Sequence, residues 1–180
     1  MDSEQQQVSR AARGDENAFQ ILWSNHRDAV YRFACWILQD AVSAEDVVQE
    51  CFVALLEHPA RFDPAQASLR SLLLAIARNK CRSRWRTLAP EVALEDKTIG
   101  YDPEVLEHMA SDETNAILNA AVAGLPPLQR EAIFLAEYEG LGLEEAAKVA
   151  GVAVGAFKAR LYRGRERLKR EMAWLTKEGY

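Results

Sequence analysis

The 180-residue chain is poor in glycine, proline and cysteine, and each shortage excludes a class of protein. Only nine Gly and six Pro, beside many Ala, Leu, Glu and Arg, favour helices over a turn-rich β fold. Three widely spaced cysteines and three scattered histidines show no zinc-ligand spacing, so we expect buried, reduced thiols, no metal and no disulfide framework. Nucleophile-elbow and glycine-rich phosphate-loop motifs are also missing, so we expect no enzymatic activity and no cofactor.

Long apolar runs are missing as well. No run approaches the ~20 residues of a membrane span, and the beginning of the chain is polar and mixed in charge, unlike a signal peptide. We therefore expect a cytoplasmic protein without direct membrane insertion. Hydrophobic residues make up 49% of the chain and charged residues 27%, which suits a folded core and argues against wholesale disorder.

The net charge of −5, from 22 basic and 27 acidic side chains, is distributed unevenly. Residues 1–88 hold eleven of each sign, residues 89–113 hold one basic and eight acidic, and residues 114–180 hold ten basic and eight acidic. The middle segment also has two prolines and a glycine and lacks sustained apolar periodicity, which is typical of an exposed linker. We predict an all-α chain with two small helical domains, 1–88 and 114–180, joined by an acidic flexible linker, 89–113.

Apolar residues at helical spacing predict three substantial helices in the first domain. The first runs from Ala18 to about Gln39. The second starts at Ser43, where Asp46 three residues later suggests a capping box, and the third follows Ser68 as its N-cap.

A helical projection of the second helix separates two faces. The predicted core face consists of Val47, Val48, Cys51 and Leu55. The opposite face is an acidic strip that consists of Asp46, Gln49, Glu50, Val53 and Glu57. A solvated surface is enough to explain such a strip, so the residues alone leave its role open.

The third helix changes character along its length. Its apolar side consists of Leu69, Leu72, Leu73 and Ile76, and five basic residues follow within nine positions: Arg78, Lys80, Arg82, Arg84 and Arg86. The projection places four side chains opposite the leucines: Arg78, Arg82, Trp85 and Arg86. Cations around an aromatic ring suit a nucleic-acid backbone with an exposed base. Arginines that favour the dipole at a helix C-terminus are an equally weighted alternative.

The second domain contains a helix-turn-helix pattern. Leu125-Pro126-Pro127 introduces a helix over Glu131 to Glu139, a short helix follows over Leu143 to Ala150, and a long helix starts at about Val154. Small and apolar residues stand where the two later helices would turn and cross: Ala147, Gly151, Phe157 and Leu161.

The long helix is strongly basic, with seven basic side chains and one acidic between residues 158 and 170. A helix in the major groove meets phosphates on both flanks and base edges near its start, which accounts for this bias. We expect base contacts from its first half: Lys158, Ala159, Arg160, Tyr162 and Arg163. We expect phosphate contacts from Arg165, Arg167 and Lys169.

With these residues in view, the chain resembles the sigma-70 family of bacterial RNA polymerase sigma factors, in particular its small extracytoplasmic-function (ECF) group. Four segments carry the resemblance: Ala44–Phe52, Arg61–Asn79, Leu125–Glu131 and Gly151–Leu161. The chain departs from the family at Leu69 and Leu72, where Phe and Trp are common, and at Ala159, where Ser is frequent. These departures bear on promoter sequence more than on function.

The resemblance implies a sigma region 2 helical bundle followed by a region 4 helix-turn-helix domain. It implies binding of the clamp helices of core RNA polymerase by Asp46, Gln49, Glu50 and Phe52. It implies contacts with the minus-ten promoter element by Arg78, Asn79, Arg82, Trp85 and Arg86. It implies contacts with the minus-thirty-five element by Lys158, Ala159, Arg160, Tyr162, Arg163 and Arg165. An anti-sigma factor is a further partner that the family implies.

The function we expect is that of a sigma factor, which binds core polymerase and directs promoter-specific transcription initiation. The alternative is an autonomous helix-turn-helix regulator that binds duplex DNA without polymerase. Such a regulator needs neither the acidic strip nor the basic third helix. A protein-interaction module is disfavoured by the charge of the long helix.

Overall fold

The computed structural model describes residues 3–88 and 120–178, and the side chains of 86–88 and 174–178 lie outside that description. Within the described residues every regular element is a helix, which confirms the all-α fold class. The predicted linker, 89–113, lies outside the described residues.

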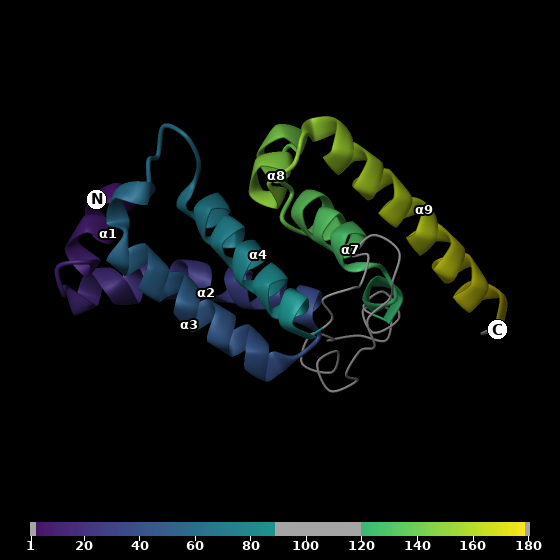
Figure 1. Ribbon diagram of the computed structural model, residues 1–180, viewed down its shortest axis with the longest axis horizontal. Helices are drawn as coiled ribbons and strands as arrows, with labels where there is room; N and C mark the ends of the chain where they lie inside the picture. Colours follow the sequence, from purple (N-terminus) through teal and green to yellow (C-terminus); the bar gives the residue numbers. More distant parts are fainter. Residues whose placement is uncertain (1–2, 89–119, 179–180) are drawn as a thin grey trace.

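Four α-helices form the first half of the molecule. They are α1 (Glu4–Ala11), α2 (Glu16–Leu38), α3 (Ala41–Glu57) and α4 (Leu69–Leu88), with a 3-10 turn at Pro59–Arg61 between the last two. Helices α2, α3 and α4 pack on one another and α1 packs on α2 (Figure 1). The prediction of three helices missed α1.

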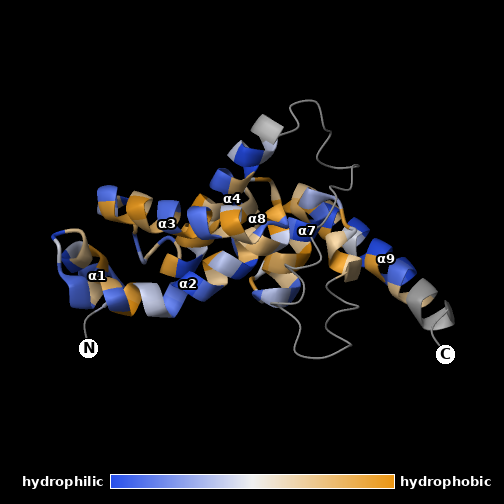
Figure 2. Ribbon diagram, turned by 90° about the horizontal axis from the view of Figure 1, so that it is seen from below, coloured by the Kyte–Doolittle hydropathy of each residue, from blue (hydrophilic) through white to orange (hydrophobic). Residues whose placement is uncertain are grey.

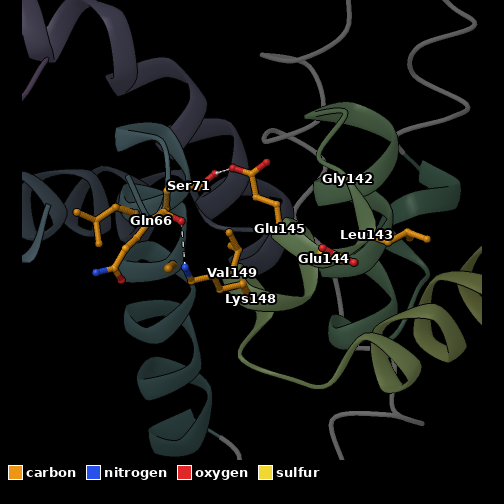
Figure 3. Close-up of a pocket in the computed structure, with 11 residues that line it drawn as sticks. Gln66, Ser71, Gly142, Leu143, Glu144, Glu145, Lys148 and Val149 are labelled. Atoms are coloured by element: carbon orange, nitrogen blue, oxygen red, sulfur yellow. Dashed lines mark hydrogen bonds between the residues drawn. The ribbon is translucent and has the colours of Figure 1, made fainter. Parts of the chain in front are cut away.

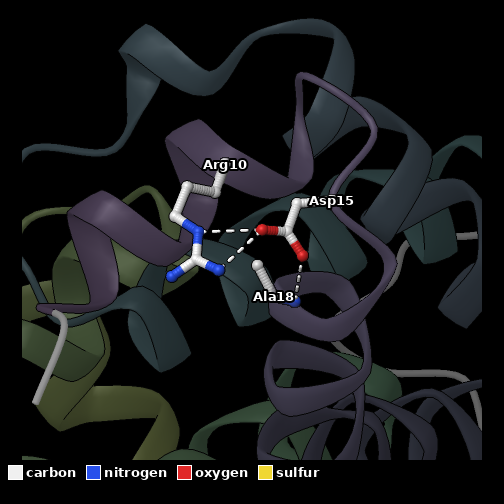
Figure 4. A network of polar contacts seen from close by, with 3 residues as sticks. All are labelled: Arg10, Asp15 and Ala18. Carbon is white, nitrogen blue, oxygen red and sulfur yellow. Dashed lines mark hydrogen bonds and ion pairs between the residues drawn. The ribbon is translucent and has the colours of Figure 1, made fainter.

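Helix α1 is short, but capping and burial hold it in place. Ser3 and Gln6 form a reciprocal capping box at its start, and Val8 and Ala11 are buried. Asp15 then joins α1 to α2: its carboxylate caps α2 by accepting from the Ala18 N–H at 3.1 Å and also accepts two hydrogen bonds from Arg10 (Figure 4).

Helix α3 begins earlier than predicted. Its N-cap is Asp40, whose carboxylate accepts from the Ser43 N–H at 2.9 Å, so the predicted start at Ser43 is wrong by three residues. Hydrogen bonds from Ser43 hold the pKa of Asp40 below its usual value of 3.8. The carboxylate at the earlier position captures a free N–H of the first turn, which moves the start of the helix toward it.

The second half consists of α7 (Pro127–Ile133), a π-helical turn η2 (Phe134–Tyr138), α8 (Leu143–Ala150) and α9 (Val154–Glu178). Proline occupies the first turn of α7, as predicted. The helix predicted to run on to Glu139 instead widens into η2, where the Glu139 N–H donates to the Phe134 carbonyl.

The two halves pack against each other. Helix α7 contacts α2 and helix α8 contacts α4, and we call this contact the seam. At its centre the Phe134 ring meets Phe33 and Trp36 edge-on, at centroid distances of 5.3 and 5.1 Å. Figure 2 shows hydrophobic residues gathered where these four helices meet, so one core runs through both halves.

Candidate functional site

The acidic strip of α3 faces solvent, as predicted. The opposite, core face of α3 is buried, including all four residues predicted for it. Asp46 and Gln49 are exposed, whereas Glu50 is half-buried and pairs with Lys80 at 3.2 Å and Arg84 at 2.6 Å. Hydrogen bonding from Arg84, and then from Lys80, lowers the pKa of Glu50. The strip lines a shallow groove of about 320 Å³.

Phe52 is a core residue and not part of the exposed strip. Its side chain is 2% exposed, and its ring lies 6.0 Å from that of Phe19 and 4.8 Å from that of Trp23. The Phe52 side chain is therefore not accessible to a partner in this arrangement. The projection places this position between the two faces of α3, where the neighbouring aromatic rings of α2 cover it.

The cationic end of α4 is only partly accessible. Asn79 is exposed, whereas Arg82 is partly buried and the Arg78 side chain is 10% exposed. Arg78 donates from Nε to Glu131 Oε1 across the seam at 3.2 Å. The side chain of Arg86 lies outside the described residues.

Trp85 is 7% exposed and belongs to the core, so its ring is not accessible to a base in this arrangement. Its burial continues a series in which every fourth residue of α4 is buried: Leu69, Leu73, Ala77, Cys81 and Trp85. Four-residue steps turn by about 40° around a helix, so the buried face drifts along α4. In the last turns of α4 the buried face therefore lies on the side of the helix opposite the leucines of the first turn.

The basic helix α9 has the geometry of a recognition helix. Phe157 and Leu161 are buried at 0% and 3% exposure and anchor it, and Gly151 ends α8 with a φ of 65°. Most of the predicted contact residues are exposed: Lys158, Ala159, Tyr162, Arg163 and Arg165. Tyr162 is 66% exposed despite its aromatic ring, and Arg165 pairs with Glu137 of η2.

Arg160 points the other way, toward the interior. Its side chain is 12% exposed and its Nη1 lies 4.0 Å from Glu131 Oε2. Glu131 is thus placed between Arg78 of the first half and Arg160 of the second. Burial raises the pKa of Glu131 to about 7, against the opposing effect of Arg78 and Arg160.

Arg130, next to Glu131, is fully buried and joins the two halves. Its guanidinium donates to the carbonyls of Trp36 at 2.9 Å and Ile37 at 3.2 Å, and to those of Ala123 at 2.6 Å and Leu125 at 2.9 Å. The first two carbonyls belong to the last turn of α2, which contains no basic residue of its own. Arg130 therefore caps the C-terminus of α2 from the other half, where a cation also favours the helix dipole.

Further polar contacts cross the seam at its edge. They are Arg70 Nε with Glu139 Oε2 at 2.6 Å, Ser71 Oγ with Glu145 Oε1 at 2.5 Å, and Lys148 Nζ with the Gln66 carbonyl at 3.1 Å. A pocket of about 840 Å³ opens between α4 and α8 beside the last two contacts (Figure 3). No role was predicted from the sequence for these residues or for Arg130 and Glu131. The sequence feature that could have indicated their burial is a pair of adjacent charged residues, Arg130 and Glu131, within the largely apolar segment 125–135.

The three cysteines are free and buried, as expected, and burial raises the pKa of each thiol. Among the residues that the structure describes, no three His, Cys, Asp or Glu side chains are grouped so as to hold a metal ion. In the same part of the chain, no helix combines the length and apolarity that a membrane crossing requires.

Comparison with known families matches the two halves to two parts of one family. Residues 22–90 match sigma-70 region 2 and residues 115–168 match sigma-70 region 4. ECF RNA polymerase sigma factor SigC of Mycobacterium tuberculosis is 34% identical over 169 residues, covering 88% of this chain and 85% of SigC. SigE of Mycolicibacterium smegmatis is 30% identical over 171 residues, and this chain spans 65% of its length.

Two solved structures share the fold over most of both chains. CnrH, in complex with the cytosolic domain of CnrY, superposes with a TM-score of 0.69 at 27% identity, covering 96% of this chain and 98% of that one. The sigma factor RpoE of Bartonella quintana, in complex with the anti-sigma factor NepR, gives 0.68 at 27% identity, covering 86% and 96%. The chain therefore belongs to the sigma-70 family of RNA polymerase sigma factors, in its extracytoplasmic-function group.

Proposed function

We propose that this sigma factor reads the two promoter elements with separate halves and contacts core polymerase with the acidic strip of α3. The first domain would comprise residues 1–88, the linker 89–113 and the second domain 114–180. The observation that carries the proposal is α9, an exposed cationic helix held by the buried anchors of a helix-turn-helix. As a binding subunit, the chain has no chemistry of its own and acts with polymerase in the cytoplasm.

The minus-thirty-five element is assigned to the exposed side of α9. The bases would contact the first half of the helix, at Lys158, Ala159, Tyr162 and Arg163, which all face solvent. Arg165 lies farther along the helix, where the phosphate backbone passes a recognition helix that enters the major groove. Arg160 would join them once it is released from the neighbourhood of Glu131.

The minus-ten element is assigned to the second half of α4. Arg78, Asn79, Arg82 and Arg86 supply cations and a hydrogen-bonding amide for an opened strand, and Trp85 supplies a ring on which a base can stack. Of the four whose side chains the structure describes, Arg78, Asn79, Arg82 and Trp85, only Asn79 is exposed in the present arrangement.

The acidic strip is assigned to the clamp helices of core polymerase. Asp46 and Gln49 are exposed on the side of α3 that faces away from the core, so a basic partner surface can reach them. Glu50 is already held by Lys80 and Arg84, which makes it the weaker contact. Phe52 supports the strip from beneath through its aromatic packing and does not touch the partner.

An anti-sigma factor is a further proposed partner. CnrH was solved in complex with CnrY, and RpoE with the anti-sigma factor NepR. The similarity of both chains to this one over most of their length supports regulation by a dedicated protein inhibitor.

Run-off transcription with purified core polymerase tests the proposal. Genomic fragments should yield promoter-dependent transcripts only when this chain is present. Asp46→Lys should weaken core binding, because it places a cation against a basic partner, while Asp28→Lys on the exposed side of α2 serves as the matched control. Duplex DNA binding without any promoter-dependent transcript would instead favour the autonomous regulator.

A further inference from the structure

An ion pair joins the basic helix α9 to the π-helical turn η2. Arg165 of α9 donates from Nε to Glu137 Oε1 at 2.8 Å, and its Nη2 donates to the same oxygen. Both side chains are about half exposed, at 54% and 48%. An exposed ion pair contributes little to stability, so the stability of the fold does not account for this double contact.

Arg165 lies on the exposed side of α9 that is assigned to promoter DNA. Lys158, Tyr162 and Arg165 follow one another at spacings of four and three residues, which places them on one face of the helix, and all of them are exposed. Arg165 stands about 10 Å along the axis from Lys158. That distance suits a backbone strand at the edge of the groove that the start of α9 enters.

Glu137 is held in place by the aromatic packing of its own turn. Its neighbour Tyr138 stacks on Phe134 at a centroid distance of 5.0 Å and lies 5.4 Å from the ring of Trp36. The Glu139 N–H donates to the Phe134 carbonyl at 2.9 Å and closes the wide turn. The carboxylate therefore approaches α9 from an anchored backbone. A guanidinium held by such an anchor has fewer orientations than one that projects freely into water.

We propose that Glu137 is a positioning residue for promoter specificity. It holds the Arg165 guanidinium in one orientation, so that this group meets a backbone phosphate when α9 occupies its correct register on the minus-thirty-five duplex. The inference rests on the function proposed above, because it takes α9 as the helix that binds this element.

The geometry of the guanidinium suits this role. Its five N–H donors form a planar fork, and the contact with Glu137 uses Nε and Nη2. That contact does not involve Nη1, whose N–H groups can donate charge-assisted hydrogen bonds to a phosphate. The carboxylate therefore orients the fork without occupying all of it.

Glu137 affects specific and non-specific DNA complexes differently. At the promoter element α9 has one register, so a phosphate meets a guanidinium whose ordering has already been achieved in the free protein. On other sequences the protein shifts along the duplex, and the attraction depends on charge rather than on the direction of one side chain. The negative charge of Glu137 weakens both complexes, whereas the orientation that it imposes strengthens only the first. Glu137 thereby raises the ratio of the two affinities.

Glu137→Gln in the full chain tests the proposal, because the amide removes the charge that holds the guanidinium and keeps the size of the side chain. The probes are the minus-thirty-five duplex of a promoter found by run-off transcription and a duplex of equal length with that element scrambled, both at one salt concentration. The ratio of the two affinities should fall about two- to tenfold, as expected when one side chain must be ordered on binding. The far-UV circular dichroism spectrum should not change.

Glu166→Gln is the matched control for the charge. Glu166 is 43% exposed on α9 itself and pairs with Lys169 at 2.9 Å, so this substitution removes the same charge from a neighbouring position. A lysine ammonium has no planar fork to orient. The control should raise the affinity for both duplexes and leave their ratio unchanged. An equal fall of the ratio in both variants would show that charge alone acts, and would overturn the proposal.

A double-mutant cycle tests whether Glu137 acts through Arg165. In an Arg165→Ala background, Glu137→Gln should have no further effect on the ratio, because no guanidinium is left to orient. The same fall of the ratio with and without Arg165 overturns the inference, as does an unchanged ratio in Glu137→Gln alone. A wild-type chain that binds the promoter and scrambled duplexes equally would instead overturn the function proposed for α9, so the two failures are distinguishable.

Discussion

Replacing Arg130 by Met should reduce the free energy of unfolding by about 3 kcal/mol. The side chain is fully buried and donates to four carbonyls, and a carbonyl left buried without its donor costs about 1–3 kcal/mol. The Trp36 carbonyl also accepts from Gln39 at 2.8 Å, so the loss falls on the other three. Removing the buried charge of Arg130 is favourable and offsets part of this cost. The net loss should therefore lie near the lower end of the range for three unpaired carbonyls, at about 3 kcal/mol.

Urea unfolding followed by circular dichroism measures the change. Because two of the four carbonyls lie in each half, Arg130→Met should also separate the unfolding transition of one half from that of the other. Arg130→Lys keeps the charge, but a single ammonium cannot span carbonyls of both halves, so it should restore only part of the stability. A loss below about 1 kcal/mol with a single transition would refute the assignment of Arg130 as the link between the halves.

Four other outcomes can be checked. Asp40→Ala should lower the free energy of unfolding by about 1 kcal/mol, and Asp40→Asn by much less. Because the pKa of Asp40 lies below its usual value, the stability that this cap contributes is present above pH 4 and is lost as the pH falls through the lowered pKa. Acid unfolding of wild type compared with the Asn variant would show this loss. Gly164→Ala places a Cβ 3.0 Å from a side chain of α7 and 3.3 Å from its backbone, so we expect a lower melting temperature, whereas Gly155→Ala meets nothing and should raise it. Arg163→Ala should cost about 1–3 kcal/mol of binding on the preferred minus-thirty-five duplex and less on others, while equal weakening on all sequences would show a phosphate contact. Because burial raises the pKa of Glu131 to about 7, the stability that its protonation contributes is present below its ordinary pKa and is lost as the pH rises through about 7. Urea unfolding at pH 6 and pH 8 should show this loss, and Glu131→Gln should remove it.

The features that could be predicted from the sequence are those set by local periodicity. The two faces of α3, the turn at Gly151 and the anchors of α9 depend on spacing within one or two helices, and the structure confirms each. The exposure of most basic residues of α9 could also be predicted, because a cation at the surface needs no tertiary partner to remain in contact with water.

The features that were missed depend on contacts between helices. Trp85 is buried because the buried face rotates gradually along α4. A single helical projection centred on the first turns does not reproduce this rotation. The burial of Phe52 depends on Phe19 and Trp23 of α2. Arg130 was not identified because its partners are backbone carbonyls as far away as Trp36, and carbonyls leave no sequence pattern.

The adjacent charges of α7 specify how the two halves pack. Consecutive helical residues point about 100° apart, so Arg130 reaches the end of α2 while Glu131 reaches α4 and α9. A buried charge that loses its partners is costly, so another packing of the halves would leave one or both of these side chains unpaired. Apolar rings such as Phe134 stabilise the contact, and the two charges select one arrangement of it.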